Sequence, residues 1–94
     1  PTIPFRLTQN YPNPFNPITY ITFSLPKEET AFLGIYNVKG QLVKTLINGI
    51  MNSGTHRVQW NGLDDAGKSV SSGIYFYTLQ SGNKSITHKM LLLK

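Results

Sequence analysis

The sequence of 94 residues contains no cysteine. This absence excludes a disulfide framework, a thiolate metal site and a cysteine nucleophile. No apolar run approaches the roughly 18 residues that a membrane-spanning helix requires, so we expect no membrane insertion. Helical periodicity is also lacking, because apolar residues do not recur every three or four positions over any window of about 11 residues. We therefore expect a protein that is not built on helices.

Charged side chains are scarce too, at 14% of the chain against a usual ~25%. Nine lysine and arginine residues face four acidic ones, which gives a net charge of +5. The basic residues are scattered singly, whereas a nucleic-acid-binding surface needs a stripe or patch of them. We therefore expect solvated lysines that guard strand edges, and no nucleic-acid partner.

What the sequence does contain is alternating apolar residues and β-branched or aromatic runs, separated by turn-forming residues. This pattern is typical of an all-β sandwich or barrel. Strands are predicted at residues 5–8, 18–25, 30–36, 41–47, 55–60, 74–80 and 85–93. The predicted fold is all-β, a seven-stranded immunoglobulin-like antiparallel β-sandwich. Residues 5–94 are expected to form this single domain, and residues 1–4 the end of a linker.

The period of two along each strand predicts which side chains point into the core. The predicted core residues are Phe23, Ile35, Val58, Trp60, Tyr75 and Tyr77. Residues 48–54 are predicted to form a connecting loop. Prolines at 12, 14 and 17 exclude a helix or a central strand, so the segment around them is predicted to cross between strands. At least one of the rings of Tyr11 and Phe15 is expected to enter the end of the core.

Enzymatic chemistry needs convergent groups, and few are available here. The four acids form two adjacent pairs, at 28–29 and 64–65, and neighbours on an extended chain point apart. His56 shares a strand face with Val58 and Trp60, which favours a packed, hydrogen-bonded histidine over a catalytic one. His88 is expected at the surface. With no nucleophilic triad and no phosphate-binding glycine loop, we predict that the chain is not an enzyme.

A long loop after residue 60 contains three oxygen-bearing side chains, Asn61, Asp64 and Asp65. Calcium prefers such ligands, so this loop is a candidate calcium site. The spacing is not that of an EF-hand, however, and two carboxylates rarely supply six or more ligands. The favoured alternative is that Asn61 and Asp64 accept hydrogen bonds from backbone amides and hold the loop closed, with no cofactor.

Aromatic residues on the strands allow a second binding hypothesis, a flat platform for sugar rings. The candidate rings are those of Tyr36, Trp60, Tyr75, Phe76 and Tyr77. Aromatic rings on strands are more often core residues or cross-strand pairs, and we favour that interpretation.

Four blocks of sequence carry a family resemblance. They are QNYPNPFNP at residues 9–17, IYNVKGQLV at 35–43, WNGLD with Gly67 at 60–67 and SGIYFY at 72–77. Together with the ending KMLLLK at 89–94, they resemble the type A C-terminal sorting domain of the type IX secretion system. That family in turn resembles the immunoglobulin-like domain of flagellar hook-capping proteins. The resemblance covers nearly the whole chain, and QNYPNPFNP is its most specific motif.

The resemblance implies a non-catalytic module at the C-terminus of an exported protein. Its partners would be sorting proteins at the outer membrane, and its own N-terminal cargo domain. The location would be the outer membrane, the cell surface or the extracellular space. The expected recognition surfaces are the proline-rich crossover and the last strand, which would bind by strand addition or by docking of a preformed edge. The recognition residues would be Pro12, Asn13, Pro14, Phe15, Asn16, Pro17, Lys89, Met90, Leu91, Leu92, Leu93 and Lys94.

Two other classes of function stay open. One is a carbohydrate-binding module of a secreted polysaccharide-degrading enzyme. The other is a structural spacer or assembly module, which would self-associate or hold a fixed interface with a neighbouring domain.

Overall fold

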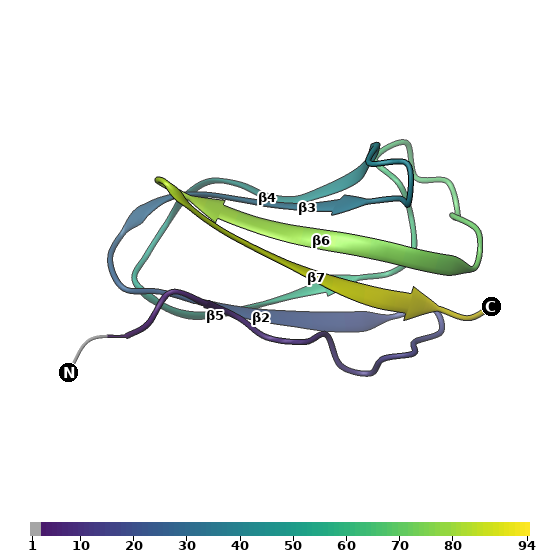
Figure 1. Ribbon diagram of the computed structural model, residues 1–94, viewed down its shortest axis with the longest axis horizontal. Coiled ribbons are helices and arrows are strands. Elements are labelled where there is room, and N and C mark those ends of the chain that lie inside the picture. Colours follow the sequence, from purple (N-terminus) through teal and green to yellow (C-terminus); the bar gives the residue numbers. More distant parts are fainter. Residues whose placement is uncertain (1–2) are drawn as a thin grey trace.

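The computed structural model describes residues 3–94, and these form seven β-strands and no helix (Figure 1). The strands are β1 (Arg6–Leu7), β2 (Thr19–Leu25), β3 (Glu29–Tyr36), β4 (Leu42–Met51), β5 (Gly54–Trp60), β6 (Gly73–Ser81) and β7 (Lys84–Leu92). No described residue belongs to a helix of the length and apolarity that crossing a membrane would require.

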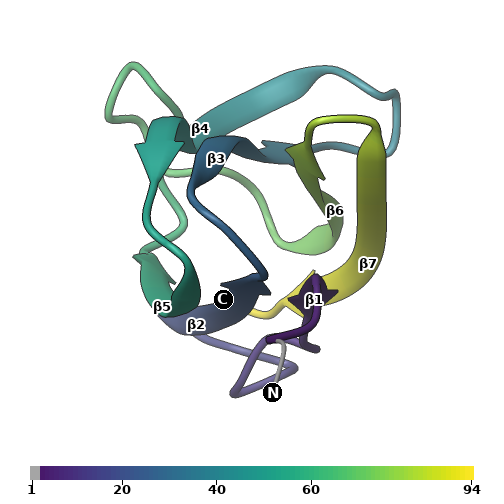
Figure 2. The same ribbon diagram turned by 90° about the vertical axis from the view of Figure 1, so that its left-hand side faces the viewer.

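The strands form two antiparallel sheets that pack face to face. One sheet has the order β1-β2-β5 and the other β4-β3-β6-β7. Seen end on, β4 and β5 lie on one side of the sandwich, and β7 lies near β1 on the other (Figure 2). The fold is thus the predicted seven-stranded immunoglobulin-like sandwich.

The strand boundaries differ from prediction mainly at β4. Residues 48–54 were expected to be a loop, but β4 continues to Met51 and only Asn52 and Ser53 separate it from β5. The turn-forming pair Asn48–Gly49 remains in the strand because β3 pairs with it, through Phe32 and Ala31. A neighbouring strand has therefore overridden a local turn preference.

The N-terminal segment is attached to the sandwich before the first strand begins. Of the predicted linker at residues 1–4, residues 1 and 2 lie outside the described part of the chain. The carbonyl of Pro4 accepts a hydrogen bond of 2.6 Å from the hydroxyl of Ser24 on β2. Order therefore extends at least one residue ahead of the predicted domain boundary at Phe5.

The core lies between the two sheets and is continuous along the molecule. Its buried residues are Leu7, Phe15, Ile21, Phe23, Leu25, Ala31, Leu33, Ile35, Trp60, Tyr75, Tyr77, Leu79, Met90 and Leu92. Val58, predicted for the core, is only half-buried and packs at its margin. The indole ring of Trp60 lies 5.7 Å from the ring of Phe15 and 5.4 Å from that of Tyr75, measured between centroids.

One polar group inside this core is fully paired. The hydroxyl of Tyr77 donates to the carbonyl of Thr8 and accepts from the backbone amide of Asn10, both at 2.8 Å. These bonds join β6 to the segment that follows β1. Burial raises the pKa of the Tyr77 phenol to about 12, while the hydrogen bond from Asn10 opposes the shift.

Replacing this hydroxyl tests its contribution to stability. We expect Tyr77→Phe to lower the free energy of unfolding by about 1–3 kcal/mol, because it leaves the buried amide of Asn10 and the partly buried carbonyl of Thr8 without this partner. Urea unfolding followed by tryptophan fluorescence measures the change. The matched control is Tyr36→Phe on the outer face of the sheet, and a similar loss in both variants would contradict this role.

The raised pKa also predicts a pH dependence. A phenol with a higher pKa in the folded than in the unfolded state holds its proton more tightly when folded. Its stabilising contribution is complete below pH 10 and is lost as the pH rises towards about 12. Between these values the unfolding free energy of the wild type should fall more steeply than that of Tyr77→Phe. Parallel slopes in urea titrations of the two proteins would refute the shift.

Candidate partner-recognition surface

The proline-rich crossover and the end of the last strand lie side by side in the structure. Phe15 donates its amide to the carbonyl of Leu91 at 3.1 Å and accepts from the amide of Leu93 at 2.9 Å. The side-chain oxygen of Asn13 accepts from the amide of Leu91 at 3.0 Å. We call this contact between residues 13–15 and residues 91–93 the seam. It brings the two predicted recognition segments into one continuous surface.

Polar side chains at the start of the crossover hold it in place. Gln9 donates its amide both to the carbonyl of Lys89, at 2.8 Å, and to the side-chain oxygen of Asn10, at 2.7 Å. Asn10, 3% exposed, donates to the hydroxyl of Thr19 and to the carbonyl of Pro12, and Thr19 donates to that same carbonyl. The polar residues of the QNYPNPFNP motif therefore position the crossover against β2 and β7.

Three of the twelve predicted recognition residues are core residues. Phe15, Met90 and Leu92 are 2%, 1% and 0% exposed, so a partner cannot reach their side chains in this structure. Strand alternation explains the last two, because Met90 lies opposite the buried Tyr75 and Leu92 is two residues further along β7. Phe15 is the expected aromatic anchor, whereas Tyr11 is 79% exposed.

The remaining recognition residues line the outside of the seam. Leu91 is half-buried, and the others are exposed: Pro12, Asn13, Pro14, Asn16, Pro17, Lys89, Leu93 and Lys94. The end of the chain is fixed as well, since Lys94 donates its amide to the hydroxyl of Ser72 at 3.0 Å and its ammonium group to Ser69.

The expectation of a free edge on the last strand needs correction. Leu91 at the end of β7 and Leu93 just after it already exchange backbone hydrogen bonds with Phe15 on the side away from β6. A partner cannot add a strand there while the seam is closed, because the donors and acceptors are occupied. Recognition would have to use the exposed side chains of the seam.

The acidic loop uses its oxygens on its own backbone. Asn61 accepts from the amide of Leu63 at 3.3 Å, and Asp64 accepts from the amides of Ala66 and Lys68, both at 2.9 Å. Asp65 accepts from the amide of Thr45 at 3.2 Å and lies 3.8 Å from the ammonium group of Lys44. Among residues 3–94, no three acidic or histidine side chains form a metal-binding group. Calcium binding here stays a prediction, and the hydrogen bonds are those of the backbone-capping alternative.

The rings proposed as a sugar platform do not share a surface. Trp60, Tyr75 and Tyr77 are buried between the sheets. Tyr36 and Phe76 are half-buried and face each other in the pairing of β3 with β6. A planar platform of the five rings is therefore excluded.

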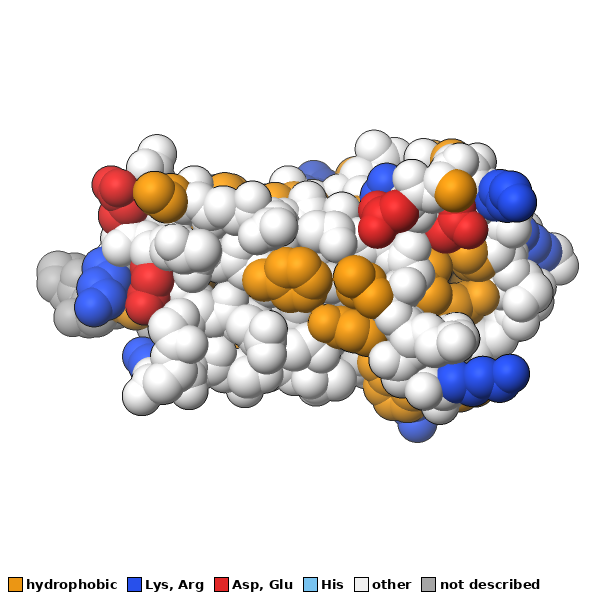
Figure 3. All heavy atoms as spheres, turned by 90° about the horizontal axis from the view of Figure 1, so that it is seen from above, with side chains coloured by type: hydrophobic (Ala, Val, Ile, Leu, Met, Phe, Trp, Pro, Cys, Tyr) orange, Lys and Arg blue, Asp and Glu red, His pale blue; other side chains and the backbone are white. Residues whose placement is uncertain are grey.

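The histidines lie in different surroundings. His56 stacks on Phe23, with 5.1 Å between ring centroids, and its Nε2 contacts the carbonyl of Asn52 at 2.8 Å. His88 was expected at the surface, but it is half-buried and its Nε2 donates to the carbonyl of Leu7 at 2.7 Å. The acids do not converge either, since the two acidic pairs lie at opposite ends of the long axis (Figure 3).

Sequence reasoning missed the polar residues that hold the crossover in place. Gln9, Asn10 and Thr19 were read only as parts of a motif or a strand. The available signal was the number of amide side chains in the proline-rich motif. Such side chains can form hydrogen bonds with backbone groups that no neighbouring strand pairs.

With this geometry described, the comparisons with known proteins can be stated. The model of the FlgD Ig-like domain family matches residues 17–85. The chain belongs to this family. No curated protein matches the sequence.

Solved structures share the fold of this FlgD-type domain. Dimeric latent PorU from Porphyromonas gingivalis superposes with a TM-score of 0.73 at 16% identity, over 97% of this chain and 10% of PorU. PorZ, described as an essential surface component of the type IX secretion system of the same organism, gives 0.62 at 23% identity, over 92% of this chain and 11% of PorZ. FlgD from P. aeruginosa gives 0.61 at 21% identity, over 79% of this chain and 57% of FlgD. The domain thus spans about a tenth of PorU or PorZ.

Hydrogen exchange tests the seam directly. In Asn13→Ala the amide of Leu91 loses its acceptor, so we expect it to exchange about three- to tenfold faster. The amide of Leu93 bonds to the backbone of Phe15 and should change less. Amide exchange by NMR on the 94-residue chain measures both, with the amide of Leu33 in β3 as the internal control. Equal acceleration of all three amides would show global destabilisation in place of a local contact.

Proposed function

We propose that this domain is a non-catalytic sorting module that directs an attached cargo protein through the type IX secretion machinery to the cell surface. The seam and the exposed residues around it are the surface that the machinery reads. The proposal includes export of the protein to the outer membrane, the cell surface or the extracellular space.

The observation that carries the proposal is where the seam lies relative to the family match. The FlgD Ig-like model covers residues 17–85, so Asn13, Phe15 and residues 91–93 all fall outside it. The parts of this chain that go beyond the common family core therefore meet each other. They build one surface at the right-hand end of the domain in Figure 1.

The extent of the structural likenesses supports the same conclusion. FlgD superposes on 79% of this chain, whereas PorZ superposes on 92% and PorU on 97%. The fuller likeness is to proteins that include a named component of the type IX secretion system. The shared fold of a complete domain, added segments included, is what a common sorting role would require.

The arrangement of polar groups supports a non-catalytic role. The described residues bring no histidine, hydroxyl and carboxylate together, and His56 and the Asp64–Asp65 pair lie towards opposite ends of β5. The carboxylates of Asp64 and Asp65 accept hydrogen bonds from backbone amides. A rigid surface of this kind binds partners with little loss of conformational entropy, which suits recognition.

A reporter fusion tests the proposal. Residues 1–94 at the C-terminus of a periplasmic reporter should bring it to the surface of a host that carries a type IX secretion system. The double variant Lys89→Glu/Leu93→Glu changes two exposed residues of the seam region. We expect it to lower the surface-exposed fraction by about tenfold, the equivalent of about 1.4 kcal/mol of binding free energy.

The control variant is Lys39→Glu/Gln59→Glu, which changes the net charge by the same amount at exposed sites outside the seam. It should leave export unchanged. Urea unfolding of both purified variants checks that they are folded. Retention of the wild-type fusion in the periplasm, or equal loss of export in the two folded variants, would sink the proposal.

A further inference from the structure

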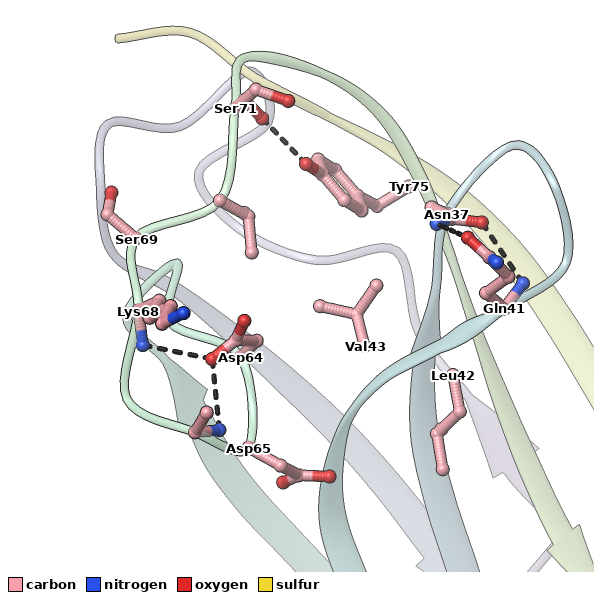
Figure 4. A pocket seen from close by; sticks show the side chains of 12 residues that line it. Asn37, Gln41, Leu42, Val43, Asp64, Asp65, Lys68, Ser69, Ser71 and Tyr75 are labelled. Atoms are coloured by element: carbon pink, nitrogen blue, oxygen red, sulfur yellow. Dashed lines mark hydrogen bonds between the residues drawn. The ribbon is translucent and has the colours of Figure 1, made fainter.

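A hollow of about 670 Å³ lies at the end of the sandwich between the turn after β3 and the loop that follows β5 (Figure 4). Pockets for small molecules have volumes of about 300–1,000 Å³, so its size suits a small ligand. One wall comes from residues 37–43, and the other from residues 64–71. The seam contributes no residue to the hollow, and Lys94 beside the seam meets the hollow at Ser69.

Both walls are fixed by hydrogen bonds. On one side Asn37 accepts from the amides of Lys39 and Gln41, and its own amide donates to the side-chain oxygen of Gln41 at 2.8 Å. On the other side one carboxylate oxygen of Asp64 holds the loop, and the amide of Asp65 donates to the carbonyl of Val43 at 3.0 Å. The loop is thus attached to β4, and the hollow between them is preformed.

Three polar groups in the hollow keep unused hydrogen-bonding capacity. They are the side-chain amide nitrogen of Gln41, the second carboxylate oxygen of Asp64 and the ammonium group of Lys68. None of these has a hydrogen-bond partner among residues 3–94. They come from both walls, and Figure 4 shows the Asp64 carboxylate and the Gln41 side chain on opposite sides of the hollow. Donors and an acceptor therefore surround the same space.

The floor of the hollow is apolar. Val43 and Val70 are half-buried there, the ring of Tyr75 closes one side, and Leu42 is 48% exposed at the margin. The hydroxyl of Tyr75 is tied to the carbonyl of Ser71 at 2.6 Å, which fixes the ring. A ligand must therefore present an apolar face to the floor and polar groups to the rim.

Both signs of charge surround the hollow. Asp64 and Asp65 face Lys68 and Lys44, which pairs with Asp65, and the ammonium group of Lys94 donates to Ser69 on the rim. A neutral ligand that both donates and accepts hydrogen bonds can use all of these groups. A sugar ring has this chemistry, with hydroxyl groups around its edge and an apolar carbon–hydrogen face.

We propose that this hollow binds a neutral monosaccharide or short oligosaccharide, with the sugar ring against Val43 and Val70 and its hydroxyl groups on Gln41, Asp64 and Lys68. The site differs from the aromatic platform considered for the strands, because no exposed ring takes part. None of the residues that line the hollow belongs to the seam.

NMR titration of the ¹⁵N-labelled 94-residue chain tests the site. The probes are maltotriose, cellotriose, mannotriose and triacetylchitotriose, each added to millimolar concentration. At least one should shift the amides of Gln41, Val43, Asp64 and Lys68 in a saturable manner. No saturable shift with any probe would overturn the proposal, as would shifts confined to Tyr36 and Phe76 on the outer face of the sheet.

Variants distinguish this pocket from weak binding elsewhere. Lys68→Ala removes the ammonium group and most of the aliphatic stem but keeps the hydrogen bond that holds the loop, because that bond uses the backbone amide of Lys68. Combined with Gln41→Ala, it should raise the Kd of the bound probe by about tenfold or more. The control pair Gln59→Ala/Lys84→Ala lies at exposed sites away from the hollow and should leave the Kd unchanged. Equal Kd values in both pairs would refute the assignment.

Discussion

The seam between the crossover and the last strand depends on the burial of Phe15. Its ring packs near Trp60 in the core, while its amide and carbonyl pair with Leu91 and Leu93 at the end of the chain. A buried aromatic ring supplies hydrophobic stabilisation that a short polar crossover otherwise lacks, and the paired backbone leaves no orphaned group beside it. Because Phe15 anchors the middle of the crossover, the prolines and asparagines on either side are held at the surface. The exposed features of this end of the domain therefore follow from one buried side chain.

The loop after β5, at the same end of the domain, is stabilised in a different way. The loop after β5 has little apolar content, and hydrogen bonds define its shape. Trp60 donates its indole N–H to the carbonyl of Leu63 at 2.9 Å, and Asp64 gathers two backbone amides a few residues further on. Gly67, at φ +82°, takes the left-handed conformation that lets the chain turn back within that span. The WNGLD block with Gly67 is thus the sequence of a self-capped loop, and it forms one wall of the hollow.

The sandwich could be predicted from the sequence because its signals are local. Alternation along β2, β3 and β6 identified Phe23, Ile35, Tyr75 and Tyr77 as inward-facing. The end of β4 could not be predicted, because Asn48–Gly49 is turn-like by composition and only its partner strand keeps it extended. The seam was likewise hidden: both segments were singled out, but the bond from Leu91 to Asn13 joins residues 78 positions apart, and no periodicity encodes it. The hollow depends on two segments that are remote in sequence, residues 37–43 and 64–71, so no local pattern indicates that they meet.

The long axis of the molecule measures 41 Å, and the described chain begins at one end of it and finishes at the other (Figure 1). A folded body joined ahead of residue 3 would therefore sit at the far pole from Lys94. The point of attachment and the seam are thus separated by the length of the sandwich.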